Sequence, residues 1–170
     1  IATPCGTYGT GQAEDYTLNI TDRISEDDYC MVSINSEVQP IKNVLFAGIN
    51  NTSESGNFAP YHEYFLDQVG EVNLGHSYPI KVEATDGGGL TVFIDWNQNN
   101  VLDDANEVYD LINGIGANSF ITVPDNALLG ETRMRIIKNS NGFADDPCGD
   151  YMEGQAEDYT LNITDRISED

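Results

Sequence analysis

Hydrophobic residues along the chain form short runs rich in Val, Ile, Phe, Tyr and Thr, separated by clusters of Gly, Asn, Asp and Pro. This alternation of strand-forming and turn-forming segments is typical of a β-sandwich. In the last run, Tyr159, Leu161 and Ile163 share one face, as the two-residue period of a strand requires. We therefore predict an all-β fold, an antiparallel sandwich of Ig-like or jelly-roll-like type with very little helix. The predicted strands are 41–49, 61–66, 77–84, 90–96, 119–123, 132–138 and 157–163, with loops at 50–57, 86–89 and 139–149 and one helical turn at 125–129.

The chain repeats itself at its two ends. The letters GQAEDYTLNITDRISED occur at residues 11–27 and again at 154–170, and the cysteines upstream share the same offset of 143 residues (Cys5 to Cys148). Self-similarity at a fixed period is the mark of repeat architectures. We interpret residues 28–170 as one complete repeat and residues 1–27 as the last strand and linker of a preceding one. The alternatives are one domain with two similar end strands, or a fragment prepared with overlapping ends.

Neighbouring repeats are the partners that this organisation implies, joined head to tail. Residues 11–21 carry a strand sequence without the domain it once completed. Either the chain continues as one covalent array, or these residues pair with a neighbouring chain by strand addition. In the second case Cys5 is expected to form an interchain disulfide.

Acidic residues dominate the charge of the chain, with 29 Asp and Glu against 7 Lys and Arg and a formal net charge of −22. Such a surface repels nucleic acids and anionic membranes, whose phosphates bind through Lys and Arg. It also opposes folding by self-repulsion unless salt or cations screen it. No stretch approaches the roughly 20 apolar residues of a transmembrane helix. We expect no nucleic-acid partner, no membrane insertion, and a salty or calcium-containing medium.

Three cysteines occur, at positions 5, 30 and 148. Because Cys5 is the equivalent of Cys148, its natural partner would lie in the preceding repeat, which leaves Cys30 to pair with Cys148. Such a disulfide closes a long loop and adds about 4 to 5 kcal/mol in the chain-entropy model. It implies an oxidising location, either secreted or on the cell surface. The alternative is three buried free thiols.

One loop carries candidate metal chemistry. Residues 95–107 read DWNQNNVLDDANE and place oxygen-bearing side chains at alternate positions. Ca²⁺ binds about six to eight oxygens from a flexible loop, and alternate residues of a curling backbone can point inward together. The predicted ligands are the side chains of Asp95, Asn97, Asn99, Asp103 and Glu107 and the backbone carbonyl of Val101.

The loop departs in two ways from the EF-hand spacing that it resembles. Asn100 replaces the usual Gly, although Asn adopts the left-handed conformation more readily than most residues. The closing acid, Glu107, comes one position late, after Asn106. Because the flanks are strand-like, we predict a calcium loop within a β-sandwich; the alternative is an ordinary polar hairpin loop.

Glu157 and Asp158 form a candidate second metal site, because two adjacent acids entering a strand need an explanation. Solvated carboxylates are the alternative. His62 and His76 are the only histidines, and nothing in the sequence places either beside a nucleophile. We expect no catalytic residues and no enzyme activity.

Aromatic residues offer a different kind of site. An exposed platform for carbohydrate is one interpretation, and filling of the sandwich core is the other. The residues concerned are Trp96, Tyr61, Tyr64, Tyr78 and Tyr109.

The order of motifs supplies a family resemblance. The run VFIDWNQN at 92–99 is followed by the acids of the loop, by segments 120–135 and 147–149, and by GQAEDYT at 154–160. In this order they resemble the GEVED domain of secreted bacterial surface proteins, over nearly all of residues 28–163. The name-giving motif departs at Gln155 and Ala156, which removes one acidic group. The resemblance implies a β-sandwich accessory module on large exported proteins, often beside adhesive or hydrolytic domains, and assigns the module no activity of its own.

The expected function is a calcium-stabilised extracellular β-sandwich repeat of a surface adhesin, stalk or filament, with a glycan or another cell-surface molecule as ligand. The alternative is a carbohydrate-binding accessory module of a secreted enzyme.

Overall fold

The computed structural model describes residues 25–36, 40–53, 61–85, 87–111 and 117–165. The strand copy at 11–21, Cys5 and the residues after 165 lie outside this part of the chain. In the described part the fold is all-β, and its one helical element is the short 3₁₀ turn η1 (Glu26–Asp28). The strands are β1 (Ser33–Ile34), β2 (Ile41–Phe46), β3 (Ile49–Thr52), β4 (His62–Asn73), β5 (Ser77–Ala84), β6 (Gly89–Ile94), β7 (Val108–Leu111), β8 (Ala117–Thr122), β9 (Gly130–Asn139), β10 (Asp150–Tyr151) and β11 (Gly154–Thr164).

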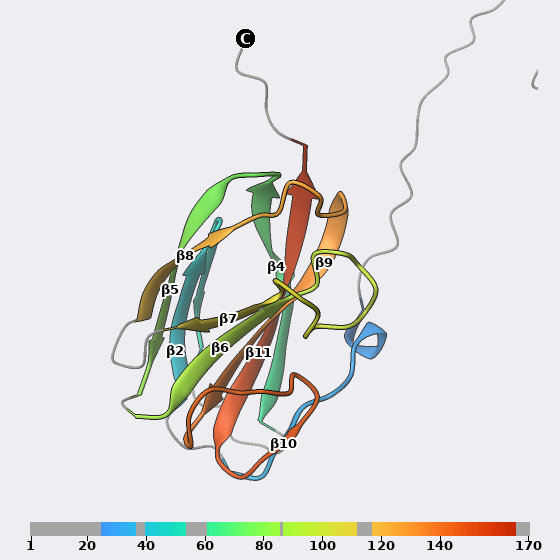
Figure 1. The fold of residues 1–170 in the computed structure, drawn as a ribbon. Helices are drawn as coiled ribbons and strands as arrows, with labels where there is room; N and C mark the ends of the chain where they lie inside the picture. Colours follow the sequence, from blue (N-terminus) through green and yellow to red (C-terminus); the bar gives the residue numbers. More distant parts are fainter. Residues whose placement is uncertain (1–24, 37–39, 54–60, 86, 112–116, 166–170) are drawn as a thin grey trace, which may run out of the picture.

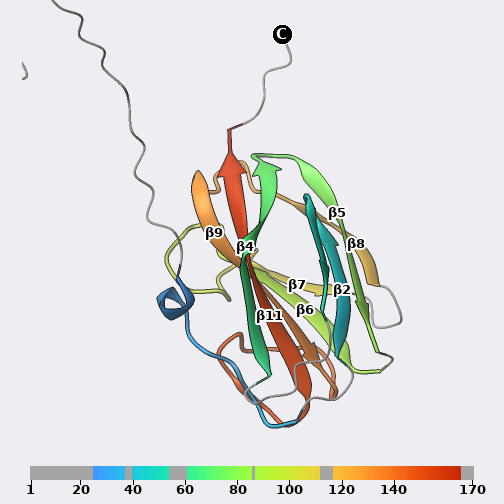
Figure 2. The same ribbon diagram turned by 180° about the vertical axis from the view of Figure 1, so that it is seen from behind.

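Two sheets face each other and form the predicted sandwich (Figures 1 and 2). One has the order β4-β11-β9-β6-β7 and the other β3-β2-β5-β8, while β1 and β10 form a small separate pair. Neighbouring strands are antiparallel, except that β11 runs parallel to β4 and β1 runs parallel to β10. The strand that carries the repeated sequence, β11, is therefore an interior strand with partners on both sides.

Several predicted boundaries were wrong for identifiable reasons. The run 41–49 is broken by a turn at Ala47 and Gly48, which have φ of 48° and 98° and make β2 and β3 a hairpin. The strand predicted at 61–66 continues to Asn73, because the backbone pairing with β11 overrides its polar residues and a bulge. In place of the helical turn predicted at 125–129, a single turn spans 124–127, closed by the Ala127 N–H, which donates to the Pro124 carbonyl at 3.2 Å. The short strands β1, β7 and β10 were not predicted.

Apolar side chains fill two regions, one between the sheets and one outside them. The inner core contains Val44, Ile80 and Met134 among many others. The second cluster lies on the outer face of the five-stranded sheet, where segment 29–34 covers it; its members are Tyr29, Val32, Ile34, Phe93, Leu102, Ile137, Ala144 and Ala156. Packing on both faces explains why β6 is buried along its whole length and why β9 and β11 are buried over most of theirs.

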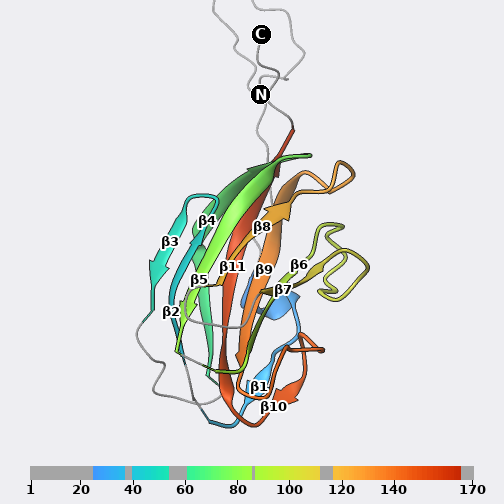
Figure 3. The ribbon, with the colours of Figure 1, turned by 60° about the vertical axis from the view of Figure 1, so that its left-hand side comes forward.

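The loop between β6 and β7 projects from an edge of the molecule (Figure 3). It leaves the five-stranded sheet at Asp95 and returns at Val108.

Candidate functional site

The loop begins at Asp95, whose backbone is hydrogen-bonded to β9. Asp95 follows β6 and is completely buried, its backbone N–H donating to the carbonyl of Arg133 at 3.2 Å. Thr132 Oγ1 donates to the Asp95 carbonyl. The far end is closed by the Ile94 N–H, which donates to the Glu107 carbonyl at 2.9 Å. The loop is thus a long hairpin connection whose two ends are fixed by the sheet.

The Asp95 carboxylate organises the first half of the loop. Its Oδ1 accepts the N–H of Asn99 at 3.1 Å, and its Oδ2 accepts the N–H of Asn100 at 2.8 Å. Oδ2 also accepts the Tyr29 hydroxyl at 2.9 Å, which links the loop to the segment on the outer face of the sheet. These bonds curl the backbone around one carboxylate, as the predicted inward-facing pattern requires.

The amides of the loop point toward a single acid. Asn97 and Asn99 donate from Nδ2 to Oδ2 of Asp104, at 3.0 and 2.7 Å. Their Oδ1 atoms accept the N–H groups of Asn99 and Val101, at 3.1 and 2.9 Å. The bonds from the two amides lower the pKa of Asp104. Amide and carboxylate oxygens of residues 95, 97, 99 and 104 thus belong to one hydrogen-bonded group.

Left-handed backbone makes this curl possible. Gln98, Asn100 and Asn106 have φ of 53°, 66° and 71°. Asn100, which stands where the EF-hand spacing has glycine, thus adopts the left-handed conformation. Non-glycine residues with positive φ are uncommon and gather at functional loops.

Glu107, at the end of the loop, uses one of its two carboxylate oxygens to bind the start of the loop. Oε1 accepts the N–H groups of Trp96 at 2.8 Å and Asn97 at 3.2 Å, whereas Oε2 is buried and has no hydrogen-bond partner among the described residues. Burial raises the pKa of Glu107 to about 7, and the charges of Asp95 and Asp104 add to this rise. Glu107 is therefore close enough to Asp95 and to Asp104 for their charges to act on its carboxylate.

Of the other two predicted ligands, Asp103 stands apart from this group, whereas Val101 joins it through its backbone. Asp103 is exposed and makes no hydrogen bond to the other predicted ligands in the described part of the chain. Its neighbour Asp104, which the alternate-position rule skipped, contacts the amides instead. The side chain of Val101 is 42% exposed, while its N–H faces Asn99.

The donor set fits a hard cation such as Ca²⁺, which prefers carboxylate, amide and carbonyl oxygens. The orphaned Oε2 of Glu107 is the observation that favours a missing positive partner. Within the described residues, no three or more His, Cys, Asp or Glu side chains gather as a metal-binding group. A cation here would depend on the amide and backbone oxygens as well as on the acids.

Glu157 and Asp158 do not share a site, because adjacent residues of β11 point to opposite faces of the sheet. Glu157 faces inward, where its Oε2 accepts the Tyr159 hydroxyl at 2.7 Å and Oε1 is buried without a partner. Burial raises the pKa of Glu157 to about 7. The predicted second metal site is corrected accordingly: these acids are separate.

Asp158 faces outward into a buried cluster of basic side chains. Arg133 donates to its Oδ2, Arg135 donates to both of its oxygens, and His62 Nε2 lies 3.0 Å from Oδ1. Burial alone would raise the pKa of Asp158, but the hydrogen bonds of Arg135 and His62 hold it below its ordinary value. Arg133 also donates to the carbonyl of Ser25 at 2.8 Å.

The remainder of the motif GQAEDY is equally structural. Gln155 is fully buried, accepts the N–H of Ile41 at 2.7 Å and donates to Glu63 at 2.6 Å. Ala156 packs in the outer cluster. A Cβ on Gly154 would lie 2.0 Å from the Lys138 carbonyl oxygen, so only glycine fits. The motif thus joins β11 to β4, β9 and the start of β2.

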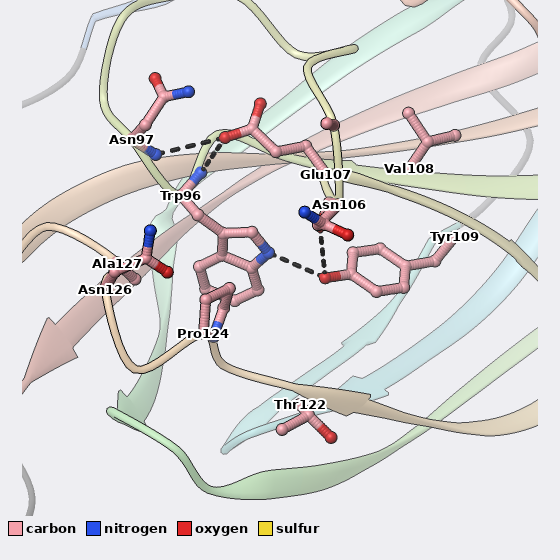
Figure 4. A pocket seen from close by; sticks show the side chains of 11 residues that line it. Trp96, Asn97, Asn106, Glu107, Val108, Tyr109, Thr122, Pro124, Asn126 and Ala127 are labelled. Carbon is pink, nitrogen blue, oxygen red and sulfur yellow. Dashed lines mark hydrogen bonds between the residues drawn. The ribbon is translucent and has the colours of Figure 1, made fainter.

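A cavity of about 520 Å³ adjoins the loop. Figure 4 shows the Trp96 indole in the middle of this pocket, with Tyr109 on one side and Pro124 on another. Trp96 Nε1 donates to the Tyr109 hydroxyl at 2.9 Å, which donates to the Asn106 carbonyl at 2.8 Å. Glu107 belongs to the loop and also lines the pocket.

The five aromatic residues do not form one exposed platform. Trp96 is 3% exposed, and the partly buried Tyr78 packs against the inner core in the other sheet. Tyr61 packs on the outer cluster, and the Tyr64 ring lies against His62 at an interplanar angle of 33°. Trp96 and Tyr109 alone line the pocket together.

Cys30 and Cys148 form a disulfide, with Cα atoms 5.5 Å apart. The bond fastens segment 29–34 to the long loop before β11. The described part of the chain contains no apolar helix of membrane-spanning length.

Residues 89–162 match the family model of the GEVED domain. The matched region runs from the start of β6 almost to the end of β11 and includes the loop, the pocket and the motif of β11. No curated protein and no solved structure matches the chain.

Proposed function

The chain carries a GEVED domain, and from this premise we propose that it is a calcium-stabilised extracellular β-sandwich repeat of a surface adhesin, stalk or filament. One observation carries the proposal: the loop wraps its backbone around the Asp95 carboxylate and gathers Asn97, Asn99 and Asp104 beside it. Such a loop holds repelling charges that a divalent cation would neutralise.

Asp95, Asn97, Asn99, Asp104 and Glu107 would hold the ion, with the Val101 carbonyl as a further oxygen. Bound there, Ca²⁺ supplies positive charge to a protein whose net charge is −22. Two of these residues also fix the ends of the loop. Asp95 is hydrogen-bonded to Thr132 and Arg133 on β9, and Glu107, just before β7, accepts the N–H of Ile94 on β6. An ion that binds only the folded state stabilises it by about 2.7 kcal/mol at a concentration one hundred times Kd.

The repeat organisation supports an extended assembly. Residues 11–21 have the sequence of β11, which in the structure is an interior strand held by β4 and β9. A strand of this kind is a natural component of a complete preceding domain. The Cys30–Cys148 disulfide supports an oxidising, extracellular setting. The coding sequence on either side of this stretch tests the array: further copies at the same period support it, and a single unit refutes it.

The adjacent acids Asp103 and Asp104 provide a matched test of calcium binding. Thermal unfolding is compared in Ca²⁺ and in EGTA for the unmodified protein, Asp104→Asn and Asp103→Asn. We expect EGTA to lower Tm in the unmodified protein and in Asp103→Asn, with a much smaller effect in Asp104→Asn. No effect of EGTA in the unmodified protein would refute calcium stabilisation, and loss of the effect only in Asp103→Asn would refute the assignment of Asp104.

A further inference from the structure

The pocket beside the loop has a shape and chemistry of its own. Its volume of about 520 Å³ lies within the range of small-molecule sites, which is about 300–1,000 Å³. It opens between the end of the loop, residues 105–109, and the turn at 124–127. Both walls consist of residues in the described part of the chain, and they form the cavity without a bound ligand.

Hydrogen bonds hold the two walls in place. The Trp96 carbonyl accepts the N–H of Leu128 at 2.9 Å, and Gln98 Nε2 donates to the Leu128 carbonyl at 2.8 Å. On the other side, the Tyr109 hydroxyl is fixed between Trp96 and Asn106. Preorganised walls lower the entropy cost of binding.

Two amides in the pocket are available to a ligand. The side chains of Asn106 and Asn126 are exposed and make no hydrogen bond within the described part of the chain. Figure 4 shows them on opposite sides of the indole. An amide offers both a donor and an acceptor, which matches the dual character of a hydroxyl group.

The charge of the pocket selects the class of ligand. The described residues that line it include no Lys, Arg or His, and Glu107 is acidic. An anionic ligand would find no positive partner there. Apolar surface comes from the half-buried Tyr109 ring, Pro124 and Ala127, with Trp96 as the floor. A ligand with C–H faces and several hydroxyls suits aromatic walls combined with free amides.

We propose that this pocket binds a neutral sugar, with Asn106 and Asn126 hydrogen-bonding its hydroxyls and the Tyr109 ring packing against its apolar face. The sugar site does not require the metal, because these three residues are not among the proposed calcium ligands. The sequence suggested an exposed platform of five aromatic residues as the carbohydrate site; the site proposed here is this single pocket.

The single tryptophan of the chain reports on this pocket without a label, because Trp96 forms its floor. The folded protein is titrated with the methyl glycosides of glucose, galactose, mannose and N-acetylglucosamine, and with glucuronate as an anionic comparison. The titrations are repeated with Asn126→Ala and Asn106→Gly; the second removes the amide and keeps a residue that tolerates φ of 71°. Asn141→Ala, at an exposed site outside the pocket, is the matched control.

We expect a saturable fluorescence change with at least one neutral glycoside and weaker binding of glucuronate. Each pocket variant should raise Kd by about tenfold, which corresponds to one lost hydrogen bond of about 1.4 kcal/mol. Asn141→Ala should leave Kd unchanged. No saturable change with any of the four glycosides, equal affinities in all variants, or equal binding of glucuronate would each overturn the proposal. Running the titrations in Ca²⁺ and in EGTA separates it from the calcium hypothesis, since binding in both media supports the sugar site alone.

Discussion

Asp158 and Arg135 form a two-point ion pair inside the domain. Arg135 Nε donates to Oδ1 at 2.7 Å and Nη2 donates to Oδ2 at 2.8 Å, and both side chains are fully buried. The pair joins β9 to β11 at directly opposed positions of the ladder. Arg135 also donates to the Pro147 carbonyl at 2.6 Å, so the same guanidinium orients the loop that carries the disulfide.

Asp158→Asn should be strongly destabilising. The substitution leaves two buried arginines without their anion, and breaking a buried pair in this way costs about 3–5 kcal/mol. Urea unfolding measures the loss. The matched control is Asp67→Asn on β4, where the side chain is exposed and the change should stay within about 0.5 kcal/mol. Equal, small effects for the two substitutions would show that the ion pair contributes no net stability.

Glu157 makes the domain less stable as the pH rises. Burial raises its pKa from 4.5 to about 7, so between these values the folded state holds a proton that the unfolded chain has released. Stability from this group is complete below pH 4.5 and falls as the pH rises to about 7. Glu157→Gln removes the titration. The variant should therefore gain stability relative to the unmodified protein between pH 5 and pH 8.

Urea unfolding of both proteins at several pH values in this window measures that difference. Glu107 titrates in both proteins and cancels from the comparison. A stability difference that does not change with pH would contradict the account of Glu157.

The disulfide should contribute stability throughout the physiological pH range. It joins residues separated by 118 positions, and removal of such a bond typically costs about 2–5 kcal/mol. The paired substitution of Cys30 and Cys148 by Ser should lower the urea midpoint by a corresponding amount. Both cysteines are exposed, so dithiothreitol should produce the same shift in the unmodified protein. An unchanged midpoint in the reduced protein would show that segment 29–34 is held by packing alone.

The sequence was sufficient for the class of fold because the two-residue period and turn clusters are local signals. β7 escaped prediction because it has only four residues, of which Leu111 alone is fully buried. The role of Asp158 escaped because it depends on the register between β9 and β11, which pairs Asp158 with Arg135 from a distant part of the chain. Sequence spacing carries no information about such a pairing.

The loop shows how far a spacing rule extends. Alternate positions correctly brought Asp95, Asn97 and Asn99 together. The rule then selected Asp103, whereas the structure turns Asp104 toward the amides. Left-handed residues at Gln98 and Asn100 change the direction of the chain and end the two-residue period. The signal that could have found Asp104 is the doubled acid at 103 and 104 itself.

Calcium titration by isothermal calorimetry tests the central claim most directly. The measurement uses calcium-stripped protein, with Asp95→Asn as the variant that lacks the central carboxylate charge and Asp67→Asn as its control. The account predicts saturable Ca²⁺ binding to the unmodified protein and to Asp67→Asn, and a binding constant lowered at least about tenfold in Asp95→Asn, equivalent to about 1.4 kcal/mol. Absence of saturable heat in the unmodified protein, or equal affinity in Asp95→Asn, would contradict it.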